Sequence, residues 1–218
     1  MKKIQKILMI SIGIIIVLII LGFFLTEPDK KPVDELTYDT YYVDNAHDDA
    51  RTFAVDLSEV GYGNEDGAWA TLQLSPSYSF GVKFNNITIP KNAIIDEAFV
   101  ELYSIGTPNH TNPNCKIYCD NVDNALPFND TLGVLNRSGR IYTQNYTRWN
   151  KTIESGNWII TPLITDVIQE IVNRENWTSG NSIAVLFVSE GQFGYVATFE
   201  NFEHNYPTGL YISWKEST

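Results

Sequence analysis

The most constraining feature of this chain is an uncharged apolar segment near its N-terminus, residues 7–25, with the sequence ILMISIGIIIVLIILGFFL. A helix of this length spans roughly 28 Å at about 1.5 Å per residue, which matches the hydrocarbon core of a bilayer. Lys2, Lys3 and Lys6 precede the segment and indicate a cytoplasmic N-terminus. A cleaved signal peptide is the alternative, but its apolar run is usually shorter and ends in small residues, whereas this one ends in bulky residues.

We therefore expect a single-pass plasma-membrane protein whose C-terminal domain is extracellular. Its parts would be a cytoplasmic N-terminus over residues 1–6, a transmembrane signal anchor over 7–25, a charged linker with two prolines over 26–37, and an extracellular domain over 38–218.

Composition narrows the classes of function. The 218 residues include 26 acidic and 15 basic side chains, which gives a net charge of −11. Such a chain is repelled by phosphate backbones, so we expect no nucleic acid among its partners. The two cysteines, Cys115 and Cys119, would lie about 13 Å apart on an extended strand, which is too far for a disulfide. We expect them to be two small residues on one face of a strand.

Short β-like runs alternate with clusters of Gly, Pro, Asn and Asp through the expected extracellular domain. The runs are residues 38–43, 52–57, 68–74, 79–85, 94–104, 115–120, 157–160, 182–188, 195–200 and 209–214. Many short strands separated by turn residues favour an all-β fold, a jelly-roll-type β-sandwich. The run 183–188 is continuously apolar, which predicts a strand buried on both faces.

One short amphipathic helix is expected over residues 162–174. Its apolar side chains follow an i, i+3, i+4, i+7, i+8 spacing, which predicts a stripe that covers a core. These side chains are Ile164, Val167, Ile168, Ile171 and Val172. Pro162 suits the first turn, and Thr161 or Thr165 is the expected N-cap.

Several pieces of sequence follow one another in a familiar order. They are residues 81–84 (GVKF), 86–93 (NITIPKNA), 94–102 (IIDEAFVEL), the helix 163–174, residues 177–185 (WTSGNSIAV) and 211–214 (YISW). In this order they resemble the DNRLRE-like β-sandwich modules of secreted and surface proteins, a group related to carbohydrate-binding modules of jelly-roll type. Lys83 stands where that family usually has arginine. The resemblance implies a binding or scaffold module.

The chain carries seven N-x-S/T acceptor sequences, all on the side expected to be extracellular. They begin at Asn86, Asn109, Asn129, Asn136, Asn145, Asn150 and Asn176. Each can accept a glycan in a secretory route that glycosylates asparagine, so we expect a glycoprotein. The alternative is that a strand protein rich in Asn and Thr accumulates such triplets by chance.

Two acidic clusters are candidate calcium sites. Asp44, Asp48 and Asp49 form the first candidate set, and Asp120 and Asp123 form the second. Calcium binds six to eight oxygens, often from Asp, Asn and backbone carbonyls, and a cation relieves repulsion between close carboxylates. Neither cluster has the spacing of an EF-hand loop, and solvated acidic turns are the alternative.

Aromatic side chains are the candidates for ligand binding. Tyr38, Tyr41 and Tyr42 lie on an expected edge strand and are candidates for stacking against sugars. The further aromatic residues considered are Trp69, Tyr78, Trp149, Trp158, Trp177 and Tyr195. For Trp158 and Trp177, which flank the expected helix, burial in the core is the favoured interpretation.

No nucleophile, zinc or phosphate-loop motif is present in the sequence, so we expect no enzyme activity. The sequence favours a membrane-anchored extracellular glycoprotein module that binds polysaccharide or surface glycan, with calcium as the one cofactor to consider. The alternative is a structural or adhesive scaffold subunit that contacts other proteins of the cell surface. Glycans spread over every face, together with an exposed sheet edge, would favour this alternative.

Overall fold

The computed structural model describes part of the 218-residue chain. The described residues are 35–53, 60–62, 71–74, 78–104, 114–128, 139–150, 154, 156–190, 194–197 and 207–217. The expected anchor and most of the linker lie outside them. Within the described residues, no helix has both the length and the apolar character that a membrane crossing requires.

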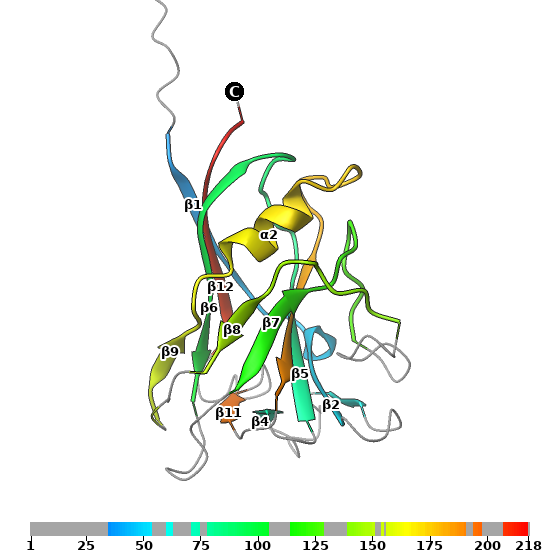
Figure 1. Ribbon diagram of the computed structural model, residues 1–218, viewed down its shortest axis with the longest axis vertical. Coiled ribbons are helices and arrows are strands. Elements are labelled where there is room, and N and C mark those ends of the chain that lie inside the picture. The colour runs from blue at the N-terminus through cyan, green and yellow to red at the C-terminus, as the bar shows by residue number, and fades with distance from the viewer. Residues whose placement is uncertain are drawn as a thin grey trace, which may run out of the picture. The chain divides into compact units, whose positions relative to one another are not determined.

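The described strands form two larger antiparallel sheets and one small sheet (Figure 1). The four-stranded sheet contains, in spatial order, β1 (Thr37–Tyr42), β12 (Gly209–Lys215), β6 (Ile94–Tyr103) and β9 (Trp158–Ile160). The six-stranded sheet contains β3 (Val60–Tyr62), β2 (Asp49–Phe53), β5 (Tyr78–Phe84), β10 (Ile183–Ser189), β7 (Cys115–Cys119) and β8 (Thr147–Trp149). The small sheet pairs β11 (Gly194–Ala197) with β4 (Thr71–Leu74).

The strands agree with the sequence pattern. Each of the ten predicted runs overlaps a strand, and a mostly-β chain is confirmed. Two strands of three residues each, β3 and β8, were not predicted. Such short strands have too few residues to show an alternating pattern, and their pairing with a neighbour decides them. The chain also crosses repeatedly between the larger sheets, for example from β5 to β6 and from β6 to β7.

Side chains from the two larger sheets meet in one buried core, as in a β-sandwich. The four-stranded sheet contributes Tyr41, Ile95, Ala98, Val100, Leu102, Leu210, Ile212 and Trp214. The six-stranded sheet contributes Phe80, Val82, Phe84, Cys115, Ile117, Cys119, Trp149, Ile183, Val185 and Phe187. The central strand β10 buries both of its faces, as its apolar run predicts. Ile183, Val185 and Phe187 face this core, and Ala184 and Leu186 belong to a second cluster on the other face.

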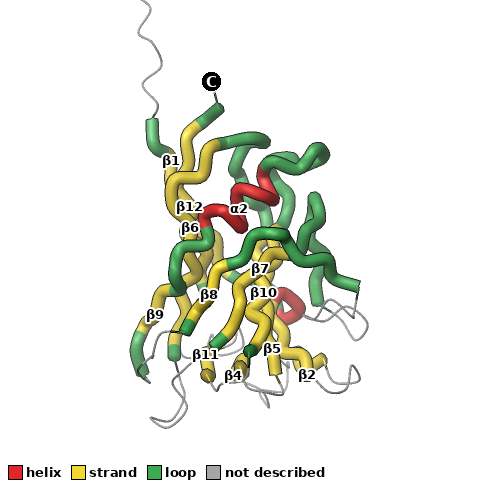
Figure 2. The backbone as a smooth tube through the Cα atoms, in the orientation of Figure 1, coloured by secondary structure: helices red, strands yellow, loops and turns green. Residues whose placement is uncertain are grey.

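The helix α2 (Thr165–Val172) contacts β6 of one sheet and β7 of the other. Figure 1 shows it across the end of the sandwich between them, and Figure 2 shows loops gathered around it. Its predicted apolar stripe is confirmed, because Ile164, Val167, Ile168, Ile171 and Val172 are all buried. The predicted caps are wrong. Ile164 occupies the N-cap without a side-chain hydrogen bond, and the Thr161 hydroxyl instead accepts from the Val100 backbone N–H at 3.0 Å.

A second apolar cluster covers the outer face of the six-stranded sheet. Ala50, Ala184 and Leu186 of the sheet pack with Ala125 and Phe128 of the loop that follows β7. Gly81 makes room for this loop, because a Cβ atom there would lie 2.7 Å from Cζ of Phe128. The loop thus reaches the sheet at a glycine, and the pocket described below forms beside it.

The two cysteines belong to the buried core. Cys115 and Cys119 are buried, unbridged thiols on the inner face of β7, which confirms their predicted place. Burial raises the pKa of both thiols.

Trp177 is buried and donates its indole N–H to the Ile89 carbonyl at 3.1 Å. Trp158 is not in the core: it is 45% exposed, because the inward position of β9 belongs to Ile159.

Candidate functional site

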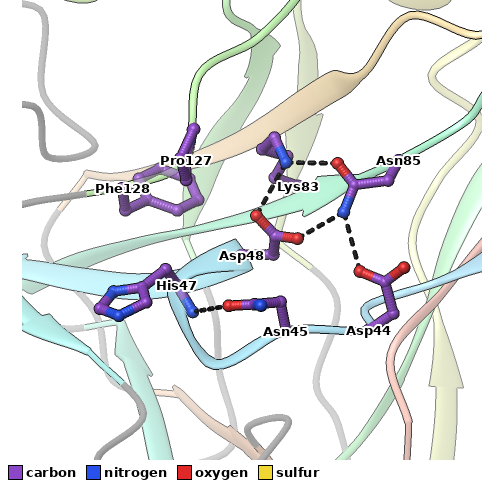
Figure 3. A pocket seen from close by; sticks show the side chains of 8 residues that line it. All are labelled: Asp44, Asn45, His47, Asp48, Lys83, Asn85, Pro127 and Phe128. Carbon is purple, nitrogen blue, oxygen red and sulfur yellow. Dashed lines mark hydrogen bonds and ion pairs between the residues drawn. The ribbon is translucent and has the colours of Figure 1, made fainter.

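A polar pocket of about 620 Å³ opens where the segment after β1 passes from the four-stranded to the six-stranded sheet. Figure 3 shows its lining side chains, Asp44, Asn45, His47, Asp48, Lys83, Asn85, Pro127 and Phe128. We call it the Lys83 pocket. Its residues come from the β1–β2 connection, from the end of β5 and from the loop after β7. They are separated by up to 84 positions in the sequence, from Asp44 to Phe128.

The floor of the Lys83 pocket is a buried ion pair. Lys83 Nζ donates to Asp48 Oδ1 at 2.8 Å, and the two residues are 6% and 3% exposed. Lys83 also donates to the Asn85 side-chain oxygen. The Asn85 amide in turn donates to Asp48 Oδ2 and, at 2.8 Å, to Asp44 Oδ1. One amide therefore ties both carboxylates to the lysine, and this satisfies a buried charge pair that would otherwise be costly.

Local sequence places these side chains. Asn45 caps the short 3-10 helix η1 (Ala46–Asp48), because its side-chain oxygen accepts from the His47 backbone N–H at 2.9 Å. This turn directs Asp48 toward Lys83. The opposite wall is fixed by the Phe128 backbone N–H, which donates to the His47 carbonyl at 3.0 Å. Lys83 faces outward because its neighbours Val82 and Phe84 alternate into the core.

The structure separates the first candidate calcium set. Asp44 and Asp48 line the Lys83 pocket together. Asp49 is also buried, but it pairs in register with Val82, a core residue, so it belongs to the opposite face of the sheet from Lys83. A lysine and an asparagine occupy the space between Asp44 and Asp48.

The second candidate set is also divided. Arg140 NH1 donates to Asp120 in an ion pair that is almost fully buried, and Arg140 also lies 4.5 Å above the Phe128 ring. Asp123 pairs instead with Arg174 Nε at 2.8 Å. Each aspartate thus has its own arginine. In the described part of the chain, no three side chains of His, Cys, Asp or Glu converge as a metal site would require.

Aromatic side chains gather on the outer face of the four-stranded sheet. They are Tyr38 and Tyr42 of β1, Tyr211 of β12, Phe99 and Tyr103 of β6, and Trp158 of β9. We call this surface the ring face. Tyr38 is 70% exposed and Tyr42 is 52% exposed. The strand register brings the rings together, because Tyr211 pairs with Phe99 and Tyr103 pairs with Trp158.

The rings pack against one another and against the sheet. Phe99 and Tyr211 stack with their centroids 4.8 Å apart and their planes at 20°. Tyr103 and Trp158 meet edge to face at 5.5 Å. The Tyr42 ring lies over Gly209, because a Cβ atom at that glycine would be 3.1 Å from Tyr42 Cε1. These contacts hold five of the six rings of the ring face, those of Tyr42, Phe99, Tyr103, Trp158 and Tyr211.

The candidate tyrosines are split by the alternation of β1. Tyr38 and Tyr42 point outward, but Tyr41 is 8% exposed and belongs to the core. Its hydroxyl contacts Thr88 Oγ1 at 2.8 Å, and burial raises the pKa of the phenol. Tyr41 therefore leaves the candidate set. Trp149 and Trp177 are buried, whereas residue 69 and the side chains of residues 78 and 195 lie outside the description.

Sequence reasoning missed three members of the ring face, Phe99, Tyr103 and Tyr211, and it assigned a fourth, Trp158, to the core. Alternation within each run shows which residues share a face of one strand. It does not show which strands are neighbours, and β1, β12, β6 and β9 are not consecutive in the sequence. The sequence did hold one indication: in the predicted strand 94–104, alternation places Phe99 and Tyr103 on the same face.

Four of the seven glycosylation sequences are described. Asn86, Asn145, Asn150 and Asn176 are all exposed. Asn145 donates its side-chain amide to Glu170 at 3.0 Å, and Asn86 has a positive φ of 53°. Asn109, Asn129 and Asn136 lie outside the described residues. None of the four described asparagines lies on a strand of the ring face.

No family model and no curated protein matches the chain. Among solved structures, the chain is similar to a chain of the cryo-EM structure of Mud crab tombus-like virus. The TM-score is 0.27 and the identity is 12%, over 89% of this chain and 94% of that one. A likeness at this level does not bear on function.

Proposed function

We propose that this protein is a membrane-anchored, extracellular, non-catalytic glycoprotein module of jelly-roll type that binds polysaccharide or surface glycan across the ring face. The observation that carries the proposal is the set of rings on one sheet face, of which Tyr38, Tyr42 and Trp158 are exposed and all but Tyr38 pack against a neighbour. Tyrosine and tryptophan offer large flat areas, and they lose little conformational entropy on binding because their own packing already fixes them. The apolar face of a sugar ring can stack on such a surface.

The charges of the ring face favour a neutral glycan. Glu97 and Glu101 occupy outward positions of β6, in register with Ser213 and Gly209 of β12. Lys215 lies at the end of β12, away from the rings of Tyr42 and Trp158. Carboxylates accept hydrogen bonds from sugar hydroxyls, and they repel a polyanionic chain. We therefore expect uncharged polysaccharides to bind better than polyuronates or sulfated chains.

The alternative, a scaffold subunit that assembles by strand pairing, would use the edge strand β1. One contact counts against this use. The Asp39 carboxylate accepts the Thr40 backbone N–H at 2.8 Å on the exposed strand. A charged side chain that occupies an edge N–H blocks the template that a second strand would need. Glycan binding at the ring face is therefore the favoured function.

The test is retention of the full-length protein on a panel of insoluble polysaccharides, with Tyr42→Ala compared with Tyr146→Ala. Tyr146 is a matched control, since it is 47% exposed and lies against Tyr118 of the six-stranded sheet. We expect Tyr42→Ala to weaken binding about tenfold, or ~1.4 kcal/mol, and Tyr146→Ala to leave it unchanged. If the unmodified protein is retained by no polysaccharide, the scaffold alternative replaces this proposal.

A further inference from the structure

The Lys83 pocket contains hydrogen-bonding groups that its own network leaves unused. We propose that it is a second binding site, which takes one neutral sugar residue through two adjacent hydroxyl groups. This inference rests on the proposed glycan-binding function and concerns a different surface from the ring face.

The Lys83 pocket carries both hydrogen-bond donors and a hydrogen-bond acceptor that suit two adjacent hydroxyl groups of a ligand. Asp44 Oδ1 accepts from Asn85, while its Oδ2 has no hydrogen-bond partner among the described residues. Lys83 donates two of its three N–H groups, to Asp48 and Asn85. Asn45 uses its oxygen for the His47 N–H, so its NH₂ group remains. A vicinal diol can donate to a carboxylate and accept from an ammonium or amide, and this arrangement offers both.

The shape of the pocket suits a ligand of this size. Its volume of about 620 Å³ falls in the usual range of small-molecule sites, about 300–1,000 Å³. Pro127 and Phe128 form an apolar wall, which Figure 3 shows beside the polar groups of Lys83 and Asp48. A sugar has the matching character, with hydroxyl groups at its rim and C–H groups on its faces.

The pocket is also organised before any ligand enters. Asp48, Lys83 and Asn85 hold one another, and the Ser182 hydroxyl donates to Asn85 Oδ1 at 2.9 Å. A site whose side chains are already ordered loses less entropy on binding. Of the polar lining residues, Asp44, Asn45 and His47 are exposed and have to become ordered around the ligand.

Charge selects a neutral sugar over an acidic one. The ammonium of Lys83 is matched by the carboxylate of Asp48, so the carboxylate of Asp44 gives the polar floor a net negative charge. A hexuronate would bring a further carboxylate to this site without a cation in excess to receive it.

The position of the pocket connects it to the ring face. Asp44 lies two residues after Tyr42, the last residue of β1, so their Cα atoms are at most about 7 Å apart. The pocket and the ring face are therefore close along the chain at the end of β1, although they belong to the outer sides of different sheets.

The experiment is saturation-transfer NMR on the full-length protein with three probes: neutral methyl hexosides, the same hexosides lacking one hydroxyl, and methyl hexuronides. We expect transfer to the neutral hexosides with a dissociation constant of order 1 mM, or about −4 kcal/mol. The deoxy compounds and the hexuronides should bind several-fold more weakly. Asp44→Ala should reduce hexoside binding at least fivefold, whereas Glu175→Ala, which removes an exposed carboxylate elsewhere, should not.

Two results would overturn the inference: no transfer to any hexoside, or hexoside binding that is unchanged in Asp44→Ala. Its failure is distinguishable from failure of the proposed function. If polysaccharide retention depends on Tyr42 while Asp44→Ala changes neither retention nor hexoside binding, the ring face stands and the pocket does not. If no polysaccharide is retained while hexoside binding still depends on Asp44, the pocket stands and the ring face does not.

Discussion

Replacement of Gly81 by alanine tests how the loop after β7 is held on the six-stranded sheet and hence how the Lys83 pocket is built. The added Cβ would lie 2.7 Å from Cζ and 3.0 Å from Cε1 of Phe128, and 3.1 Å from Cδ2 of Leu186. Ordinary carbon–carbon contacts are about 3.5–4.0 Å, so the methyl group overlaps its neighbours by up to roughly 1 Å. Phe128 is 1% exposed and Arg140 lies 4.5 Å from its ring, so the ring can yield to the methyl group only on the side of the Lys83 pocket that it lines.

The expected cost follows from this overlap. Overpacking a filled site destabilises proteins by about 1–3 kcal/mol, which outweighs the gain of roughly 0.5–1 kcal/mol that alanine otherwise has over glycine within a strand. We expect Gly81→Ala to lower the free energy of unfolding by about 1–2 kcal/mol, and to lower the melting temperature by about 3–6 °C.

The assay is urea unfolding followed by tryptophan fluorescence, with Gly81→Ala, Phe128→Leu and the double variant compared. A smaller side chain at Phe128 frees the space that the methyl group needs, so the double variant should lose less stability than the sum of the two single variants. The reasoning would be refuted by a Gly81→Ala protein as stable as the parent, or by two losses that simply add.

Three further predictions concern charge and burial. Burial raises the pKa of both Cys115 and Cys119, so these thiols stay neutral in the folded protein, whereas they ionise above about pH 8.5 in the unfolded chain. Their contribution to the free energy of unfolding is therefore complete below that pH. Above it, this contribution is lost at about 1.4 kcal/mol per pH unit for each thiol. Urea unfolding between pH 7.5 and 9.5 should show this decline, and a Cys115→Ala/Cys119→Ala protein with an equally steep decline would contradict it. Arg140→Met should lower the free energy of unfolding by about 3–5 kcal/mol because it leaves Asp120 buried without its cation. Adding Asp120→Asn to the same protein should recover part of this loss, and thermal melts that show equal stability of the single and double variants would contradict the prediction. A chelator should leave the melting temperature unchanged because Lys83, Arg140 and Arg174 already pair with Asp48, Asp120 and Asp123. A clear drop would restore calcium as a counter-ion of the acidic clusters.

The candidate site was only partly predictable from the sequence. The sequence predicts Tyr38, Tyr41 and Tyr42 as binding candidates. Tyr38 and Tyr42 are exposed, but the prediction is wrong for Tyr41, which is buried because strand alternation directs it to the core. Of the predicted set Asp44, Asp48 and Asp49, the first two share one pocket and Asp49 lies on the other face of the sheet. Lys83, the partner of Asp48, is singled out in the sequence only by its place in a motif. It lies 35 positions from Asp48, and nothing in the local sequence shows that the two side chains meet.

Most elements of this protein follow from local sequence. Alternation and turn residues predict ten of the twelve described strands, and the 3.6-residue period predicts the buried stripe of α2, because these patterns depend on neighbours within a few residues. Which strands lie side by side is settled by the packing of the whole fold. That choice assembled the ring face from β1, β12, β6 and β9, and paired each buried aspartate with one basic side chain. The physical reason is that strand pairing and ion pairing are long-range choices, made by the packing of the whole core rather than by adjacent residues.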